Sequence, residues 1–142
     1  FLHLFPDDYH QKYVGRTSEG VLFIIDDQII SHPSQPTEDL LCLYLFYPNG
    51  ALKTYEIVSL GLRDAKQHDP HNLVLARLLS SLGPHKIEGI RVSPFSVEFR
   101  NRRFGYWFRD DAGEDADEPL ITAYPGDTKM FYPPWEQGAY DT

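Results

Sequence analysis

Residues 40–50, LLCLYLFYPNG, determine what kind of fold this chain can adopt. The first eight of them are apolar or aromatic without a break, which is typical of a β-strand that is covered on both sides. Alternation along a strand assigns the side chains to two faces, Leu41, Leu43, Leu45 and Tyr47 on one and Leu40, Cys42, Tyr44 and Phe46 on the other. Because both faces are apolar, we expect this strand at the centre of a sheet with a layer packed against each face.

A tight turn is predicted directly after this run. Pro48-Asn49-Gly50 separates it from ALKTYEIV, residues 51–58, which is a second stretch of strand-forming residues. Asn-Gly is strongly favoured in short hairpin turns because both residues tolerate positive φ angles. The sequence therefore predicts an antiparallel hairpin around residues 48–50.

One helix is predicted, at about residues 70–82, from the stretch DPHNLVLARLLSSLGP. Asp69 suits the N-cap, Pro70 suits the first helical position, and Gly83-Pro84 is a strong helix end. An apolar stripe with the i, i+3, i+4, i+7 spacing of one helix face is formed by Leu75, Leu78, Leu79 and Leu82. We expect this stripe to cover a sheet.

Short strands are predicted on both sides of the helix. Phe95, Val97 and Phe99 alternate with Ser96, Glu98 and Arg100 before a turn expected at Asn101-Arg102. A length of 142 residues is sufficient for one domain with its own core. We therefore predict a single α+β domain over residues 1–142, built as an antiparallel meandering β-sheet with the helix at about 70–82 packed on one face.

Composition and charge argue against several classes of function. The 21 acids and 13 bases give a net charge of −8, which disfavours a nucleic-acid partner because phosphate binding needs clustered bases. No stretch approaches the ~18 apolar residues of a membrane span, and no basic start followed by an apolar run suggests a signal peptide. A single cysteine, Cys42, allows no internal disulfide and favours a reducing, cytoplasmic setting.

Catalytic and cofactor motifs are not found in the sequence. It contains neither a G-x-S-x-G element nor a glycine-rich phosphate loop. His68 and His71 lie near Asp64 and Asp69 and could offer ligands to a metal, but an acid is expected there for helix capping, and no second ligand pair follows. We expect no catalytic residue, cofactor or metal, and the sequence favours a non-enzymatic role without deciding the question.

The segment DDAGEDADEP, residues 110–119, is a concentrated acidic stretch with six acids and no base. It interrupts what would otherwise be another hairpin, so we predict a solvated loop, for which solubility alone is the simplest role. Clustered acids also speed association with a basic partner and discriminate against acidic ones. Our leading hypothesis is an immunity-like binding protein, monomer or homodimer, that presents these acids to a basic protein: Asp110, Asp111, Glu114, Asp115, Asp117 and Glu118.

The closing stretch FYPPWEQGAYDT, residues 131–142, supports an alternative hypothesis. Its two prolines favour an extended backbone, and its aromatic rings would form an exposed apolar patch unless they fold back on the sheet. We expect the tail to act as a clasp over the core. A small-ligand-binding protein or a hydrolase would then have its pocket between sheet and tail, lined by Tyr106, Trp107, Trp135 and Tyr140.

Four stretches carry a resemblance to known sequences: YVGRTSEG, LYLFYPNGAL, IRVSPFSVEF and the closing FYPPWEQGAYDT. The chain resembles a set of small bacterial proteins that end in an aromatic-Pro-Trp-x-x-Gly-x-Tyr-Asp-Thr tail. No activity, cofactor or catalytic residue comes with this resemblance. It implies only a bacterial, cytoplasmic setting.

Overall fold

The structure is a computed structural model that describes residues 1–7, 11–63, 70–109, 120–126 and 130–131. Within these ranges the chain forms strands and one helix, α1 (His71–Ser81). The strands are β1 (Leu2–Leu4), β2 (Tyr13–Thr17), β3 (Leu22–Ile30), β4 (Glu38–Phe46), β5 (Leu52–Leu62), β6 (His85–Ile87), β7 (Ile90–Val92), β8 (Phe95–Phe99), β9 (Arg102–Phe108), β10 (Ile121–Tyr124) and β11 (Met130–Phe131).

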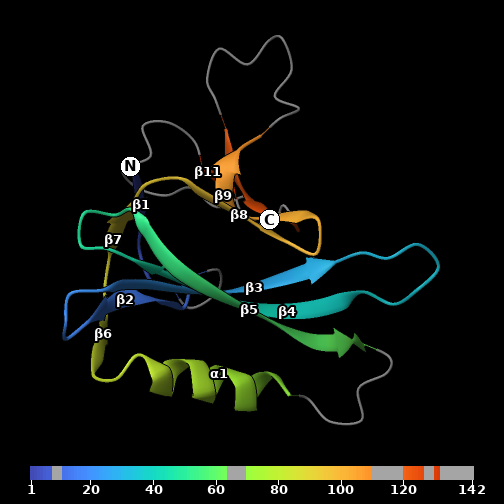
Figure 1. Ribbon diagram of the computed structural model, residues 1–142, viewed down its shortest axis with the longest axis horizontal. Coiled ribbons are helices and arrows are strands. Elements are labelled where there is room, and N and C mark those ends of the chain that lie inside the picture. Colours follow the sequence, from blue (N-terminus) through green and yellow to red (C-terminus); the bar gives the residue numbers. More distant parts are fainter. Residues whose placement is uncertain (8–10, 64–69, 110–119, 127–129, 132–142) are drawn as a thin grey trace.

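The strands form three antiparallel sheets. A five-stranded sheet has the order β5-β4-β3-β2-β6, a four-stranded sheet has the order β11-β10-β9-β8, and β1 pairs with β7. Figure 1 shows α1 along one side of the five-stranded sheet and the four-stranded sheet on the other side. The predicted α+β class, with antiparallel meandering strands and one helix on a sheet face, is confirmed. The division of the strands into two packed layers was not predicted.

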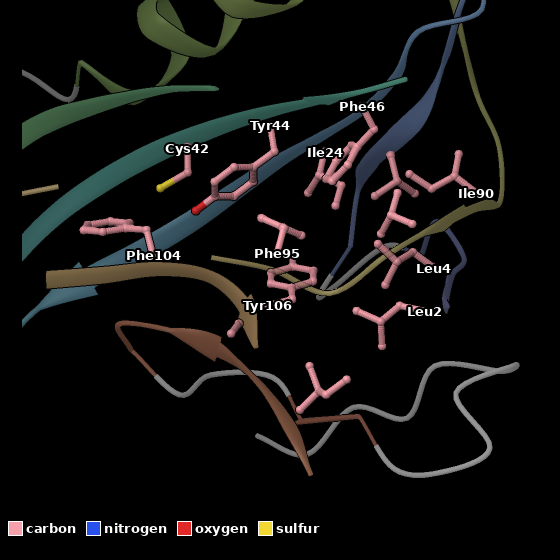
Figure 2. Close-up of a cluster of buried hydrophobic side chains, with 14 of the residues drawn as sticks. Leu2, Leu4, Ile24, Cys42, Tyr44, Phe46, Ile90, Phe95, Phe104 and Tyr106 are labelled. Atoms are coloured by element: carbon pink, nitrogen blue, oxygen red, sulfur yellow. The ribbon is translucent and has the colours of Figure 1, made fainter. Parts of the chain in front are cut away.

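The central position of β4 is confirmed on both of its faces. Leu41 and Leu43 belong to the apolar cluster beneath α1. Figure 2 shows the opposite cluster, between the two sheets, which receives Leu40, Cys42, Tyr44 and Phe46 from β4. Full burial of one large apolar side chain stabilises the fold by about 1.5–3 kcal/mol, so this strand is a major source of stability.

The helix lies within the predicted range. Leu75 and Leu78 are buried against the five-stranded sheet, and Leu79 and Leu82 pack at the margin of the same cluster. Gly83 follows the helix with a φ of 68°, as expected for a glycine that ends a helix. The predicted cap, Asp69, lies outside the described residues.

The two hairpin turns that were predicted are both present, with one change in each. Gly50 has a φ of 93°, but the φ of Asn49 is not positive. The Asn49 side chain instead accepts a hydrogen bond from the N–H of Ala51 at 3.0 Å. In the β8–β9 hairpin, Arg100 and Asn101 have φ angles of 52° and 60°. The turn therefore lies one residue earlier than predicted, because Phe99 pairs directly with Arg102. Two positive φ angles are typical of a tight hairpin turn.

Aromatic rings fill the space between the two large sheets. The Phe95 ring lies 4.6 Å from Tyr44, 5.0 Å from Phe46 and 5.2 Å from Tyr106, measured between ring centroids. Phe131 of β11 extends this stack, 5.4 Å from Tyr106. The β1–β7 pair contributes further apolar side chains, Val92 and the three labelled in Figure 2, Leu2, Leu4 and Ile90.

Candidate functional site

The acidic segment lies between two strands that are direct neighbours in one hairpin. Ile121 of β10 pairs with Phe108 of β9, and the N–H of Arg109 donates to the carbonyl of Leu120 at 2.9 Å. The ladder therefore continues up to the residues that bound the segment. A hairpin needs only about 2–5 loop residues, so the ten residues 110–119 exceed what this connection requires. The six candidate acids themselves lie outside the described residues.

Negative charge is unevenly distributed along the chain. The described residues, which we call the framework, hold 9 of the 21 acids and 11 of the 13 bases. The other segments hold 12 acids and two bases, and half of those acids fall in residues 110–118. Without the six acids of residues 110–118, the net charge of the chain would be −2 instead of −8.

Several framework acids are neutralised by a specific base. Asp39 accepts three hydrogen bonds of 3.0–3.1 Å from Arg63, and Glu56 accepts one of 2.7 Å from Arg77. The hydrogen bond to Asp39 raises the pKa of Arg63, as that to Glu56 raises the pKa of Arg77. These pairs are largely exposed, so solvent screening leaves each of them only a small contribution to stability.

Glu38, at the start of β4, is the centre of a charge cluster that is less exposed than the Arg63–Asp39 and Arg77–Glu56 pairs. It is 6% exposed and accepts hydrogen bonds from His32 Nε2 at 2.9 Å, from Arg100 Nη1 at 2.8 Å and from the Ser59 hydroxyl. Burial by itself would raise the pKa of Glu38. The hydrogen bonds from Ser59, His32 and Arg100, with the Arg100 charge, outweigh it and hold the pKa below its ordinary value of 4.5.

This cluster connects the two large sheets. Ser59 belongs to β5 of the five-stranded sheet, whereas Arg100 comes from the β8–β9 turn of the four-stranded sheet. The Arg100 guanidinium also lies over the Phe99 ring, 5.0 Å from its centroid. The turn in which Arg100 has a positive φ thus directs the Arg100 side chain toward Glu38 of the five-stranded sheet.

The chemistry of the cluster does not favour catalysis. Ser59 and His32 both contact Glu38, so the carboxylate lies between the hydroxyl and the imidazole, unlike in a catalytic triad. The Ser59 oxygen also accepts the N–H of Gly61 at 3.2 Å. A general base works best with a pKa near the operating pH, and the pKa of Glu38 is lowered instead. The arrangement suits a structural ion pair.

A second polar group lies in the core between the sheets. Asp26 and Gln28 on β3 are each 1% exposed. The Gln28 amide donates to Asp26 at 3.0 Å, and its oxygen accepts the N–H of Gly126 at 2.9 Å, which connects β3 to the residues that follow β10. Buried polar groups in proteins are nearly always hydrogen-bonded. Through these hydrogen bonds, Gln28 fixes the position of the residues after β10 in the four-stranded sheet.

Tyr44 and Gln11 bring further polar atoms to the same layer. The Gln11 amide donates to the Tyr106 hydroxyl at 3.1 Å. Among the described residues, the buried Gln11 oxygen and the buried Tyr44 hydroxyl have no hydrogen-bond partner. Burial raises the pKa of Tyr44 well above 10, so its hydroxyl stays protonated. Unpaired buried groups of this kind cost about 1–3 kcal/mol each.

The residues of the alternative pocket are only partly described. Tyr106 is fully buried in the core, and its backbone pairs with Ala123. Trp107 is the next residue of β9 and pairs with Thr122, so its side chain is on the opposite face of the sheet. Consecutive strand residues face opposite sides of a sheet, so these two side chains cannot line one pocket together. Trp135 and Tyr140 lie outside the described residues, and their part in a pocket stays a prediction.

The described histidines and the cysteine do not gather into a metal site. His71 Nε2 lies 2.9 Å from an Asp27 carboxylate oxygen, and His68 is outside the described residues. Within the ranges that the structure describes, no three His, Cys, Asp or Glu side chains gather as metal ligands would. Cys42 is buried in the core, as its position in β4 predicted.

Sequence reasoning missed the Glu38 cluster. Its four members come from positions 32, 38, 59 and 100, and no spacing rule connects them. Only an acid at the border of a long apolar strand could have drawn attention, because Glu is seldom buried without a partner.

Comparisons with known proteins found no relative for this chain. No family model, no curated protein and no solved structure matches it. Among the described residues, no helix combines the length and the apolar character that a bilayer crossing requires. Function must therefore be inferred from geometry and charge.

Proposed function

We propose that this chain is a non-enzymatic, immunity-like binding protein that presents the six acids of its acidic segment, residues 110–119, to a basic protein partner in the bacterial cytoplasm. The observation that carries the proposal is the position of the segment. Six acids occupy a connection between strands β9 and β10, whose pairing is already closed at Arg109 and Leu120. The hairpin does not need these residues, so their charge is available for another purpose.

The use of acids elsewhere in the chain supports this interpretation. Framework acids such as Glu38 and Asp39 have bases or other donors that hold them in place. The acidic segment contains no base of its own. A cluster of like charges creates a potential that attracts a basic surface and raises its association rate by about 10–10³-fold, an effect that salt weakens.

A capture experiment followed by a titration tests the proposal. The immobilised chain would first be exposed to a lysate of the source organism at low salt, and retained proteins identified. Binding of the retained basic protein would then be measured for the natural chain and for a variant with all six acids changed to their amides. We expect the variant to bind more weakly and with a smaller salt dependence.

Two double variants provide a matched control, since each removes two negative charges. Asp110→Asn with Asp111→Asn changes the segment, whereas Glu19→Gln with Glu98→Gln changes two exposed framework acids. The proposal requires a larger loss of affinity in the first pair. Equal losses in both pairs would show a general charge effect and would contradict a specific role for the segment.

The alternative, a small-ligand-binding protein or hydrolase with a pocket beneath the tail, has less support. Tyr106 and Trp107 face opposite sides of β9, and the lowered pKa of Glu38 makes it a weak base. A thermal shift caused by a small molecule and lost in Trp135→Ala would favour this alternative over ours.

A further inference from the structure

Strand β6 forms one edge of the five-stranded sheet, and no strand of the described residues pairs with its outer side. It is the last strand in the sheet order, and all three of its residues are exposed. Ser18 N–H donates to Pro84 and Glu88 N–H donates to Val14, so the backbone groups of the even-numbered residues face β2. Those of His85 and Ile87 consequently point away from the sheet. Figure 1 shows β6 at the margin of the molecule.

The charges along this edge are not balanced within one chain. Lys86 lies directly opposite Arg16 of β2, and like charges in that position destabilise a sheet. Glu88 lies 3.2 Å from the Arg16 guanidinium, and both side chains are nearly half exposed. Among the described residues, Lys86 forms no ion pair. An acid placed opposite Lys86 on its outer side would therefore relieve the mismatch.

Exposed apolar side chains accompany these charges. Ile87 is 45% exposed, and Phe5, which lies against Gly89, is 46% exposed. A shallow depression of about 440 Å³ next to Ile87 is lined by Tyr13 and Pro6 together with the charged residues Asp7 and Lys12. Apolar groups at an open sheet edge favour pairing with another strand.

We propose that β6 pairs antiparallel with β6 of a second copy of this chain, about a two-fold axis at Ile87. Such an axis is perpendicular to the sheet, so residues at equal distances from it lie opposite each other. Ile87 then packs against Ile87 of the partner subunit. Lys86 lies opposite Glu88 of the partner subunit, and Glu88 lies opposite the partner's Lys86. Each copy supplies both members of the pair, as a closed two-fold interface requires.

The charges select this register. If the axis passed through Lys86 instead, that lysine would lie opposite its own copy, which like-charge repulsion disfavours. With the axis at Ile87, the outward backbone groups of Ile87 meet those of the other copy, as an antiparallel ladder requires. The pairing extends the sheet from five strands to ten across the two copies.

The opposite edge, β5, is protected against such pairing. Its register against β4 shifts between Asp39 and Leu40 and again between Leu45 and Phe46. Lys53 is the extra residue at one of these bulges, between Leu52 and Thr54. Bulges hinder the addition of another strand, whereas the pairing of β6 with β2 has no register shift, so β6 is the better candidate.

Sedimentation of the full chain over a range of concentrations tests the proposal. The chain should pass from 16.4 kDa at low concentration to twice that mass at high concentration. Lys86→Glu places acids opposite acids at both pairs, and Glu88→Lys places bases opposite bases. We expect each variant alone to dimerise roughly tenfold more weakly, and a mixture of the two to recover the dimer as a heterodimer.

Recovery by mixing distinguishes pairing from a loss of folding, because a misfolded variant would not be rescued. Ile87→Pro is a second variant: it removes an N–H that faces away from β2, so the fold should persist while the dimer is lost. A chain that stays at 16.4 kDa up to about 1 mM would overturn the proposal. So would a dimer that is unaffected by all three substitutions. Neither result depends on the acidic segment, so the proposed function is tested separately.

Discussion

Carboxylates occur in two different settings in this protein, the framework and the acidic segment. In the framework, Glu38 is 6% exposed and is held by donors from three other segments, and Asp39 is bound by Arg63 at 3.0 Å. Residues 110–118 instead bring six acids together without a base, beyond a hairpin that is already closed. The comparison teaches that a carboxylate can fix the geometry of the fold, and we propose that the acids of residues 110–118 serve a partner instead. The two settings should respond oppositely to mutation.

The largest effect on stability is expected at Glu38. Glu38→Ala removes the acceptor shared by His32, Ser59 and Arg100, and should lower the free energy of unfolding by about 2–3 kcal/mol. Chemical denaturation measures this change. Glu19→Ala, at an exposed acid, is the control and should stay within about 0.5 kcal/mol. A Glu38 variant as stable as this control would remove the distinction between the two settings.

Lowering the pH should remove the contribution of Glu38 to the stability of the fold. Because the pKa of Glu38 is lowered in the folded state, its ionised form stabilises the fold fully above the ordinary pKa of 4.5. This stabilisation is lost as the pH falls through the folded pKa. The difference in unfolding free energy between the natural chain and Glu38→Gln should therefore be constant above pH 4.5 and shrink below it. A difference that grew on acidification would mean that the sign of the shift is wrong.

Exposed framework pairs should contribute less. Arg63→Ala removes the base that binds Asp39, and we expect a loss of about 0.2–1 kcal/mol in the free energy of unfolding. The loss should diminish in high salt, because screening weakens exposed pairs. Denaturation of both chains at low and high salt measures it. A loss as large as that in Glu38→Ala would show that burial does not separate these acids.

The smallest effect on stability is expected in the acidic segment. Changing all six of its acids to amides should leave the free energy of unfolding within about 0.5 kcal/mol, or raise it slightly by reducing self-repulsion. Thermal or chemical denaturation is again the measurement. A large loss would show that these acids serve the fold and would weaken the proposed function.

Much of the fold could be predicted because local patterns and packing agree. The two apolar faces of residues 40–47 identified the central strand, and the leucine stripe after Pro70 identified the helix. Apolar side chains that recur on one face of a strand or helix indicate directly which residues are buried. They do not report which sheet a strand joins, so the two-layer arrangement had to come from the structure.

The misplaced turn and the missed cluster have a common cause. A turn at Arg100-Asn101 requires a positive φ at Arg100, a backbone conformation that arginine seldom adopts. The pairing of Phe99 with Arg102 across the hairpin imposes this conformation. Likewise, Glu38 meets Arg100 only when the two sheets pack together. Contacts between residues far apart in the chain decide both features. Of the predicted site residues, Tyr106 and Trp107 are described, and strand alternation separates them.

The association rate of the captured basic partner, measured against salt concentration, tests the central claim most directly. For the natural chain, we predict a rate that falls steeply as salt increases. For the variant without the six acids of residues 110–118, we predict a slower rate that changes little with salt, while its stability is retained. Equal rates with equal salt dependence in the two proteins would contradict the account.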